Sequence, residues 1–341
     1  MMDTKGISDE FKKIELSVVI LSLLSAFFYQ LGFLFIFFLI PLQFLRNTKG
    51  FMPMFKAAVI VIAITVIVSF IKTARVETFA LRSALVVSEI YIIVMMLLGF
   101  LYINYSWPGN PRMLKKLFIA TIGAFFIGIP LLLIMNSAVI QNHYKSYLTV
   151  FFEALTRTFY ESPRSYYSDI AAIFGTIDVE TVYNNIKRTI LRSYLFLYFV
   201  LLAGSWWLGS IKNVDGKWSS KLSLLAFSIP NMLWPLIIAL LTVVIDSRIS
   251  IGFLGHIGWN MLLIIATLYG LRGIGIIQTL LLVLNAPRIL RVITYVTLVL
   301  FLMQPGLNFV VLIAVPALGL SEIWINYKNI REKKHDNEDN S

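Results

Sequence analysis

The chain has 341 residues, of which 58% are hydrophobic and only 14% are charged, and its mean hydropathy is +0.81. Soluble domains contain about 25% charged residues, and a soluble fold with this much apolar surface would aggregate, so the composition excludes an ordinary soluble protein. The net charge of +11 is attributed to basic loops of a multispanning protein and not to a nucleic-acid partner. We expect an all-α polytopic membrane helix bundle in contact with a lipid bilayer.

Residues suited to covalent or metal chemistry are scarce. The chain has no cysteine, and no two of its histidines, His143, His256 and His335, have the spacing of metal ligands. No phosphate-binding loop, Ser-His-Asp set, H-E-x-x-H helix or paired-carboxylate motif occurs. We therefore expect no catalytic residue, no metal site and no cofactor, and we expect that the protein is not an enzyme.

Nine hydrophobic segments reach or approach the roughly 20 residues that cross a bilayer as a helix. Their continuous apolar character favours helices, because the strands of membrane barrels alternate polar and apolar residues. The sequence therefore predicts about eight to ten transmembrane segments. The nine are residues 16–45, 57–71, 83–105, 117–139, 193–211, 222–245, 258–283, 288–304 and 307–327.

The first of these segments is too long for one upright helix. It contains no charged residue, and Gln30, Gly32 and Pro41 interrupt it. Two short helices that form a hairpin are favoured, and one strongly tilted helix is the alternative. No signal-peptidase-like site ends this segment, so we expect it in the mature protein. The second segment is short and is expected to begin near Met52.

Lysine and arginine set the predicted orientation. Fifteen lie in one alternate set of loops and in the tail 328–341, whereas the other short loops hold only four: Lys72, Arg75, Arg82 and Arg248. Since basic loops remain in the cytoplasm, the richer set and the C-terminal tail are predicted to be cytoplasmic. The N-terminal segment 1–13 is cytoplasmic if the first hydrophobic segment is a hairpin, and outside if it crosses once. The expected location is the cytoplasmic (inner) membrane of a bacterium.

One long connection, residues 140–192, falls on the outer face in this orientation. It separates an N-terminal bundle, 14–139, from a C-terminal bundle, 193–327. Two amphipathic patterns occupy it, and we interpret them as interfacial helices on lipid headgroups or, alternatively, as a lid over an outward-opening cavity. Their apolar residues are Tyr144, Tyr147, Leu148, Phe151, Phe152, Leu155 and Phe159, and then Val179, Val182, Tyr183, Ile186 and Ile190.

Ionisable residues inside a bilayer are costly unless they are paired, so each is a candidate functional residue. Arg272 and Glu322 both fall in the cytoplasmic half of late segments, and we predict that they form an intramembrane ion pair. Such a pair is either a substrate or coupling site or a contact that fixes helix register. Glu89 lies about two turns into its segment, where a basic residue of the adjoining loop (Lys72, Arg75 or Arg82) is expected to neutralise it.

Three amides, Asn260, Gln278 and Asn326, lie within or beside the late segments. Amides at such positions commonly bridge helices by hydrogen bonds. Asn260 and Gln278 are nevertheless substrate candidates, together with Arg272 and Glu322. Small residues permit close packing of helices, which we expect from the glycines at Gly252, Gly255, Gly258, Gly270, Gly273 and Gly275.

Several separated stretches resemble the YybS-like family, whose members are uncharacterised bacterial multispanning membrane proteins. They include the sequence from Ile40 to Leu45, the aromatic-x-x-Pro-x-x-x-Trp pattern from Phe227 to Trp234, and Asn260. In the family's Tyr-x-x-Gln-Gly pattern, from Tyr269 to Gly273, Arg272 replaces the usual glutamine. The ending from Gly319 to Lys328 is similar to Gly-x-x-Asp-x-Trp-x-x-x-Arg, with Glu322 and Lys328 as conservative departures.

This family is distantly similar to the S components of energy-coupling-factor transporters. Those proteins bind a small molecule from outside and rely on separate ATPase subunits. Ser22-x-x-x-Ala26 loosely resembles the small-residue face that they offer to their coupling subunit.

The resemblance and the candidate residues together predict a small-solute binding or transport subunit. In this hypothesis a polar cavity lies beneath the 140–192 insertion, and Asn260 and Arg272 reach it. The alternative is a non-catalytic membrane scaffold or regulator that recruits partner proteins through outward small-residue faces. The expected partners are the lipid bilayer and either a small-molecule ligand or membrane proteins, including a second copy of the chain.

Overall fold

The protein is helical throughout the part of the chain that the structure describes. Every regular element in this part of the computed structural model is a helix, which confirms the all-α prediction. The helices form two compact units, unit 1 over Met1–Trp218 and unit 2 over Ser219–Ser341. The described residues are 4–76, 78–109, 112–160, 175–209 and 232–325.

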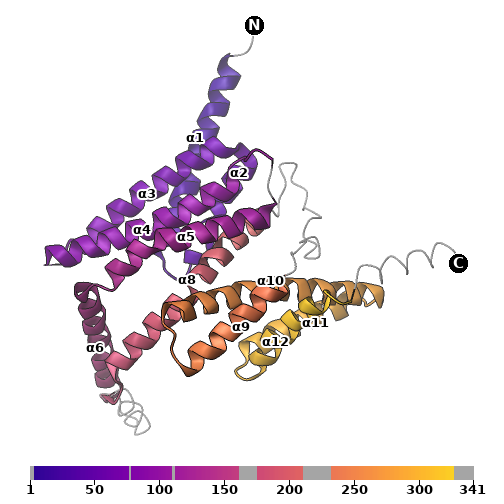
Figure 1. Ribbon diagram of the computed structural model, residues 1–341. Coiled ribbons are helices and arrows are strands. Elements are labelled where there is room, and N and C mark those ends of the chain that lie inside the picture. Colours follow the sequence, from indigo (N-terminus) through magenta and orange to yellow (C-terminus); the bar gives the residue numbers. More distant parts are fainter. Residues whose placement is uncertain (1–3, 77, 110–111, 161–174, 210–231, 326–341) are drawn as a thin grey trace. The chain divides into compact units, whose positions relative to one another are not determined.

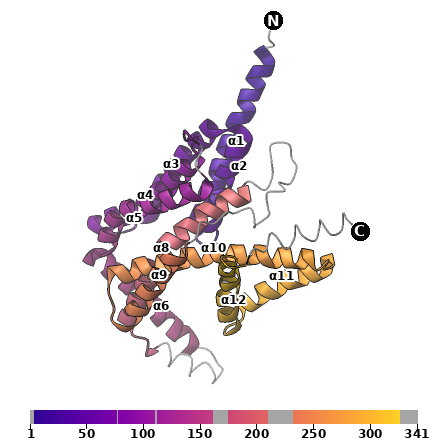
Figure 2. The ribbon, with the colours of Figure 1, turned by 45° about the vertical axis from the view of Figure 1, so that its right-hand side comes forward.

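Unit 1 is a bundle in which helices adjacent along the chain pack together. Its elements are α1 (Thr4–Gln30), η1 (Phe35–Phe37), α2 (Ile40–Lys49), α3 (Phe51–Thr73), α4 (Phe79–Asn104), α5 (Met113–Met135), α6 (Ala138–Tyr160) and α8 (Val179–Gly209). α1 packs against α2 and α3, α3 against α4, and α4 against α5. α8 returns to pack against α2 and α5. Figures 1 and 2 both show α3, α4 and α5 side by side.

The first hydrophobic segment forms the predicted hairpin. α1 ends at Gln30, the chain reverses through Gly32, and Pro41 lies in the first turn of α2. Gly32 has a φ of +61°, which glycine adopts without strain. The Oγ of Ser25 donates a hydrogen bond of 2.6 Å to the carbonyl oxygen of Phe38, which ties the returning chain to α1. The alternative of one tilted helix is therefore wrong.

Unit 2 is organised around its longest helix. It contains α9 (Leu233–Arg248), α10 (Phe253–Val283), α11 (Arg288–Met303) and α12 (Leu307–Ser321). α10 packs against both α9 and α12, and α11 packs against α12. A Cβ added at Gly258 would overlap Thr242 of α9, and one added at Gly273 or Gly319 would overlap backbone across the α10–α12 contact. The prediction of close packing is confirmed at Gly258 and Gly273, whereas a Cβ at Gly252 would meet nothing within 4 Å and one at Gly270 would make only an ordinary contact.

In the described part of the chain, five helices are long and apolar enough to cross a membrane: α3, α4, α5, α8 and α10. The second hydrophobic segment was expected to begin near Met52. Its helix, α3, begins at Phe51, which agrees with that expectation. Many large hydrophobic side chains on these helices are exposed, among them Ile67, Phe126 and Leu133. A soluble bundle would bury such side chains, whereas lipid solvates them. The architecture is that of a multi-pass membrane protein.

In the described residues, fewer helices reach full spanning length than the nine hydrophobic segments of the sequence. α9 and α11 have 16 residues each. A helix of that length spans about 24 Å, less than the hydrocarbon thickness of about 30 Å. The Glu15–Gln30 stretch of α1 and α12 are also apolar but short. Residues 210–231, which hold part of the sixth hydrophobic segment, lie outside the described ranges.

α8 crosses the predicted boundary at residue 192. It is one continuous helix from Val179 to Gly209, because its amphipathic first half contains no glycine or proline that would end it. Its partners α2, α4, α5 and α6 all belong to unit 1. The assignment of this segment to the C-terminal bundle is therefore corrected: the compact units divide after Trp218.

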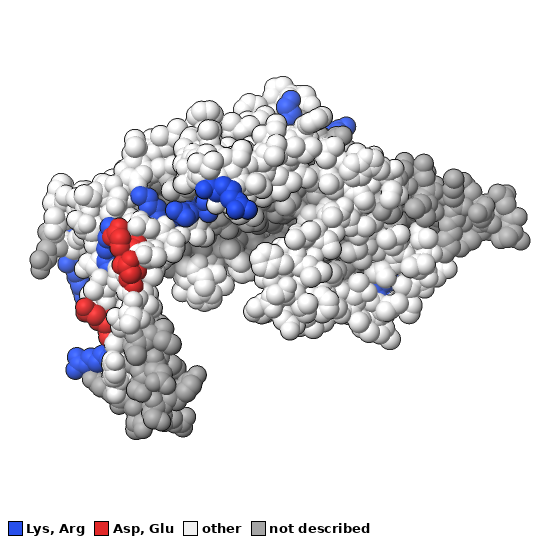
Figure 3. All heavy atoms as spheres, turned by 60° about the horizontal axis from the view of Figure 1, so that its bottom comes forward, with Lys and Arg blue, Asp and Glu red and all other residues white. Residues whose placement is uncertain are grey.

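Charged side chains are unevenly distributed on the described surface. Figure 3 shows a face that is largely uncharged, with its acidic side chains gathered at the end that carries α6. An uncharged surface of this extent is expected where helices contact lipid.

Candidate functional site

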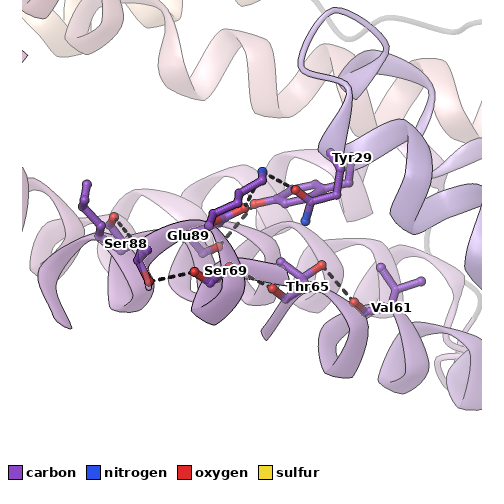
Figure 4. Close-up of polar contacts among 10 residues, drawn as sticks. Tyr29, Val61, Thr65, Ser69, Ser88 and Glu89 are labelled. Atoms are coloured by element: carbon purple, nitrogen blue, oxygen red, sulfur yellow. Dashed lines mark hydrogen bonds and ion pairs between the residues drawn. The ribbon is translucent and has the colours of Figure 1, made fainter. Parts of the chain in front are cut away.

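A cluster of polar side chains joins α1, α3 and α4. The Nζ of Lys72, in the last turn of α3, lies 3.7 Å from Oε1 of Glu89 on α4 and also donates a hydrogen bond to Oε1 of Gln30 at the end of α1. The hydroxyl of Tyr29 donates to the backbone carbonyl of Glu89 at 3.2 Å. Figure 4 shows Tyr29 and Glu89 facing one another between the helices. We call Gln30, Lys72 and Glu89 the polar cluster.

Three basic residues were expected to neutralise Glu89, and of these Lys72 lies within ion-pair distance of it. The guanidinium of Arg82 instead donates to the backbone carbonyls of Ala74 and Val76, at 3.0 and 2.6 Å, and so closes the connection between α3 and α4. Lys72, in the last turn of α3, is therefore the residue that neutralises Glu89.

The polar cluster has hydrogen-bonding capacity that the described residues do not use. The Nε2 of Gln30 is buried and has no hydrogen-bond partner among them. A buried donor in this state costs about 1–3 kcal/mol. Lys72 and Glu89 are too far apart for a direct hydrogen bond, and 50% of the Lys72 side chain and 25% of the Glu89 side chain are exposed. The cluster therefore holds a buried amide donor without a partner among the described residues, beside an ammonium and a carboxylate that are partly exposed.

A row of buried hydroxyls on α3 leads to this cluster. Thr65, Ser69 and Thr73 recur every four residues, so they lie on one face of the helix. Each donates to the carbonyl oxygen four residues earlier, at 2.9, 2.8 and 2.8 Å. Ser88, next to Glu89 on α4, is also buried and bonds to its own helix (Figure 4). These donors are satisfied, so the row adds buried polar groups beside the cluster without an unmet hydrogen bond.

In unit 2 the structure joins the two residues that the sequence analysis paired. The Nε of Arg272 on α10 donates to Oε2 of Glu322, the residue that follows α12. Only 6% of the Glu322 side chain and 21% of the Arg272 side chain are exposed. A carboxylate at a helix C-terminus is electrostatically unfavourable, and the guanidinium offsets that cost. The pair therefore fastens the end of α12 to α10.

The remaining predicted site residues do not converge on this pair. Asn260 is buried, and its Nδ2 donates to the carbonyl oxygen of His256 in its own helix at 2.8 Å. It lies twelve residues before Arg272 on α10, which corresponds to about 18 Å along the axis. Gln278 is half-buried further along α10. Asn326 lies outside the described residues. Of the four substrate candidates, only Arg272 and Glu322 meet.

The sequence analysis missed a network of amides between α2, α4 and α8. The Nδ2 of Asn104 donates to Oε1 of Gln43 at 2.8 Å, and Nε2 of Gln43 donates to Oδ1 of Asn47 at 3.2 Å. Asn47 in turn donates to the carbonyl oxygen of Gly209 at 2.6 Å. Because each amide is satisfied, the network holds three helix ends together. The signal in the sequence was the recurrence of amides beside the basic loops.

A second missed residue is Asp246 at the end of α9. Its side chain is buried, and Oδ1 accepts a hydrogen bond of 3.2 Å from the backbone N–H of Ile251. Gly255 lies against the carboxylate, where a Cβ would overlap it. The contact explains how the tight connection from α9 to α10 is held. An acidic residue at the end of an otherwise apolar segment is the sequence signal for it.

The small-residue face predicted for a coupling partner is not available in unit 1. Ser22 and Ala26 are buried within the unit, with exposed fractions of 0% and 2%. Ser22 donates to the carbonyl oxygen of Val18 at 2.6 Å, and α1 packs through this region against α2 and α3. The expectation that these residues offer an outward face is therefore wrong, because the protein's own helices cover them.

The start of α8 is fixed by a polar cap and by α6. Asp178 accepts hydrogen bonds from the backbone N–H groups of Glu180 and Thr181, at 3.1 and 3.2 Å, and from the Thr181 hydroxyl. These hydrogen bonds lower the pKa of Asp178. Lys145 of α6 lies 2.5 Å from the Glu180 carboxylate. Asp178 therefore caps the first turn of α8, and the Lys145–Glu180 pair joins this turn to α6.

A pocket of about 560 Å³ lies beside α6 in the predicted insertion. Its lining contains neither Asn260 nor Arg272, so it is not the cavity that these two residues were predicted to reach. The lining comes from α6 between Thr149 and Tyr160 and from Gly175, Ile177 and Val179.

Comparison of the chain with protein-family models, curated proteins and solved structures finds no match. The resemblance to the YybS-like family is untested by these comparisons and stays a prediction.

Proposed function

We propose that this protein binds a small polar solute at the polar cluster of unit 1, as a binding or transport subunit of the bacterial cytoplasmic membrane. The observation that carries the proposal is the buried Nε2 of Gln30, without a partner among the described residues, beside the loose Lys72–Glu89 pair. Intramembrane ionisable groups commonly mark substrate or ion pathways. A satisfied structural pair would leave no such spare donor.

The chemistry of the cluster selects the class of solute. Lys72 and Gln30 offer donors to an anionic or carbonyl group, while Glu89 offers acceptors to an amine or hydroxyl. A small solute that carries both kinds of group satisfies all three side chains at once. In the orientation predicted from the basic loops, the end of α3 that carries Lys72 faces outward, with the C-terminal tail in the cytoplasm. The solute then enters from outside.

The test is retention of a solute by purified protein. We expect wild-type protein loaded with cell extract to keep a small polar molecule that mass spectrometry detects, and K72M to lose it. Hydrogen bonds to charged groups contribute about 1.5–3 kcal/mol, so the affinity of K72M should fall roughly tenfold or more. The matched control is K56M, since Lys56 is an exposed lysine near the other end of the same helix.

Two results count against this function. One is that wild-type protein retains no solute under the same conditions. The other is that K72M and K56M retain it equally well, which would assign the cluster to helix packing.

The alternative function, a non-catalytic scaffold or regulator, is favoured by one observation in unit 2. There α10 and α12 meet backbone to backbone at Gly273 and Gly319, so the contact leaves no space for a solute. Such a unit suits a rigid platform for partner proteins. Cross-linking in membranes would return partners or a second copy if this function holds, and only monomer if it does not.

A further inference from the structure

Helix α6 has two faces with different surroundings. One face is held by its own chain: Lys145 pairs with Glu180 and lies 5.3 Å from the centre of the Tyr183 ring on α8. α6 also packs against α4. This face therefore fixes how α6 is rotated about its axis, and with it the direction of the opposite face.

The other face is exposed and apolar. Tyr147, Val150 and Phe151 have exposed fractions of 65%, 61% and 47%, and Tyr144 is exposed at 37%. Their spacing of three and four residues places them on one side of the helix. None of the four carries a charge, and more than half of Tyr147 and of Val150 is uncovered within the described chain. Such a contiguous aromatic face on a surface helix marks an interaction site.

The position of α6 in the chain indicates what this face contacts. α5 is apolar and long enough to span a membrane, and α6 begins only three residues after α5 ends, at Ala138 after Met135. α6 therefore starts at the membrane boundary. Figures 1 and 2 show that α6 runs across the direction of α5, as a helix in the plane of the membrane does when α5 stands upright. α6 itself is not among the five helices able to cross.

We infer that Tyr147, Val150 and Phe151 dock α6 on the lipid surface, with their side chains at the boundary of headgroups and acyl chains. Tyrosines concentrate at this depth because the ring is apolar and the hydroxyl remains wet. Amphipathic helices bury such a face about 5–10 Å into the interface. The Lys145–Glu180 pair, on the other side, holds α8 against the docked helix. This inference does not depend on solute binding in unit 1.

The absence of cysteine makes the test direct, because single cysteines carry spin labels without a background. Labels are placed at Tyr147 and Phe151 (Y147C, F151C), and matched controls at Asn142 and Ser146 (N142C, S146C), which are exposed on other sides of the same helix. In the full-length protein in lipid vesicles, we expect the first two labels to be accessible to oxygen and to lose accessibility to an aqueous nickel reagent. The two control labels should show the reverse.

Two results would overturn the inference. Equal accessibility of all four labels to the aqueous reagent would place the whole helix in water. Spin–spin broadening between labels at position 147 would show that a second copy, and not lipid, covers the face. Quenching of a tryptophan in F151W by brominated lipid gives an independent measurement, and quenching as weak as that of a tryptophan in S146W would also contradict lipid docking.

Discussion

The E322Q variant is expected to lose about 3 kcal/mol of unfolding free energy, the largest effect of any single change that we predict. Breaking a buried ion pair by removal of one partner costs about 3–5 kcal/mol, because the other charge stays buried without compensation. The lower end applies here, since 21% of the Arg272 side chain is exposed and relaxes toward the headgroups. Reversible unfolding in mixed detergent micelles measures the loss.

The charge-reversed double variant, R272E with E322R, tests whether the stability lost in E322Q comes from the pairing of the two charges. If the two side chains stabilise α10 and α12 through their mutual contact, the double variant recovers most of what E322Q loses. The matched control is R288Q, because Arg288 is an exposed arginine of the same unit. It should change stability by no more than about 0.5 kcal/mol. A double variant as unstable as E322Q would show that the contact between the charges is not what matters.

The second large effect is expected from G273A. An added Cβ there would overlap the backbone carbonyl of Val315 on α12, and backbone cannot turn aside as a side chain can. Overpacking of this kind costs about 1–3 kcal/mol. The matched control is G270A, three residues earlier on α10, where the added Cβ would lie 3.6 Å from Cγ of Pro316, an ordinary contact.

For G270A we expect no loss, and a gain of up to about 1 kcal/mol from the better helix propensity of alanine. The same unfolding assay compares the two variants. If both substitutions stabilise the protein, or both destabilise it equally, the close approach of α10 to α12 at Gly273 is contradicted.

The sequence predicted most elements because their signals are local. Continuous apolar runs gave the helices, and the combination of Gln30, Gly32 and Pro41 predicted the hairpin. The Arg272–Glu322 contact could be predicted for a different reason. The late segments hold few ionisable groups, and the orientation derived from the basic loops placed these two residues at the same depth. Each of the two residues therefore had few other possible partners.

The polar cluster could not be predicted in the same way. Gln30, Lys72 and Glu89 come from three helices, and the packing of α1 against α3 and the hydrogen bond from Tyr29 of α1 to Glu89 of α4 decide that they meet. Lys72 was one of three loop residues expected to neutralise Glu89, but its place in the last turn of α3 and its contact with Gln30 were not predicted. The burial of Ser22 and Ala26 was missed for the same reason, since a pattern of small residues does not reveal which helices cover it.

The central claim is that the helices cross the membrane with the Lys72 end of α3 outside, where a solute reaches the polar cluster. It is tested most directly with single cysteines that flank this helix, K49C at the end of α2 and R75C just after α3, both at exposed positions. In intact cells, a membrane-impermeant maleimide should label R75C, and it should label K49C only after the membrane is broken. Equal labelling of both in intact cells, or labelling of K49C alone, would contradict the account.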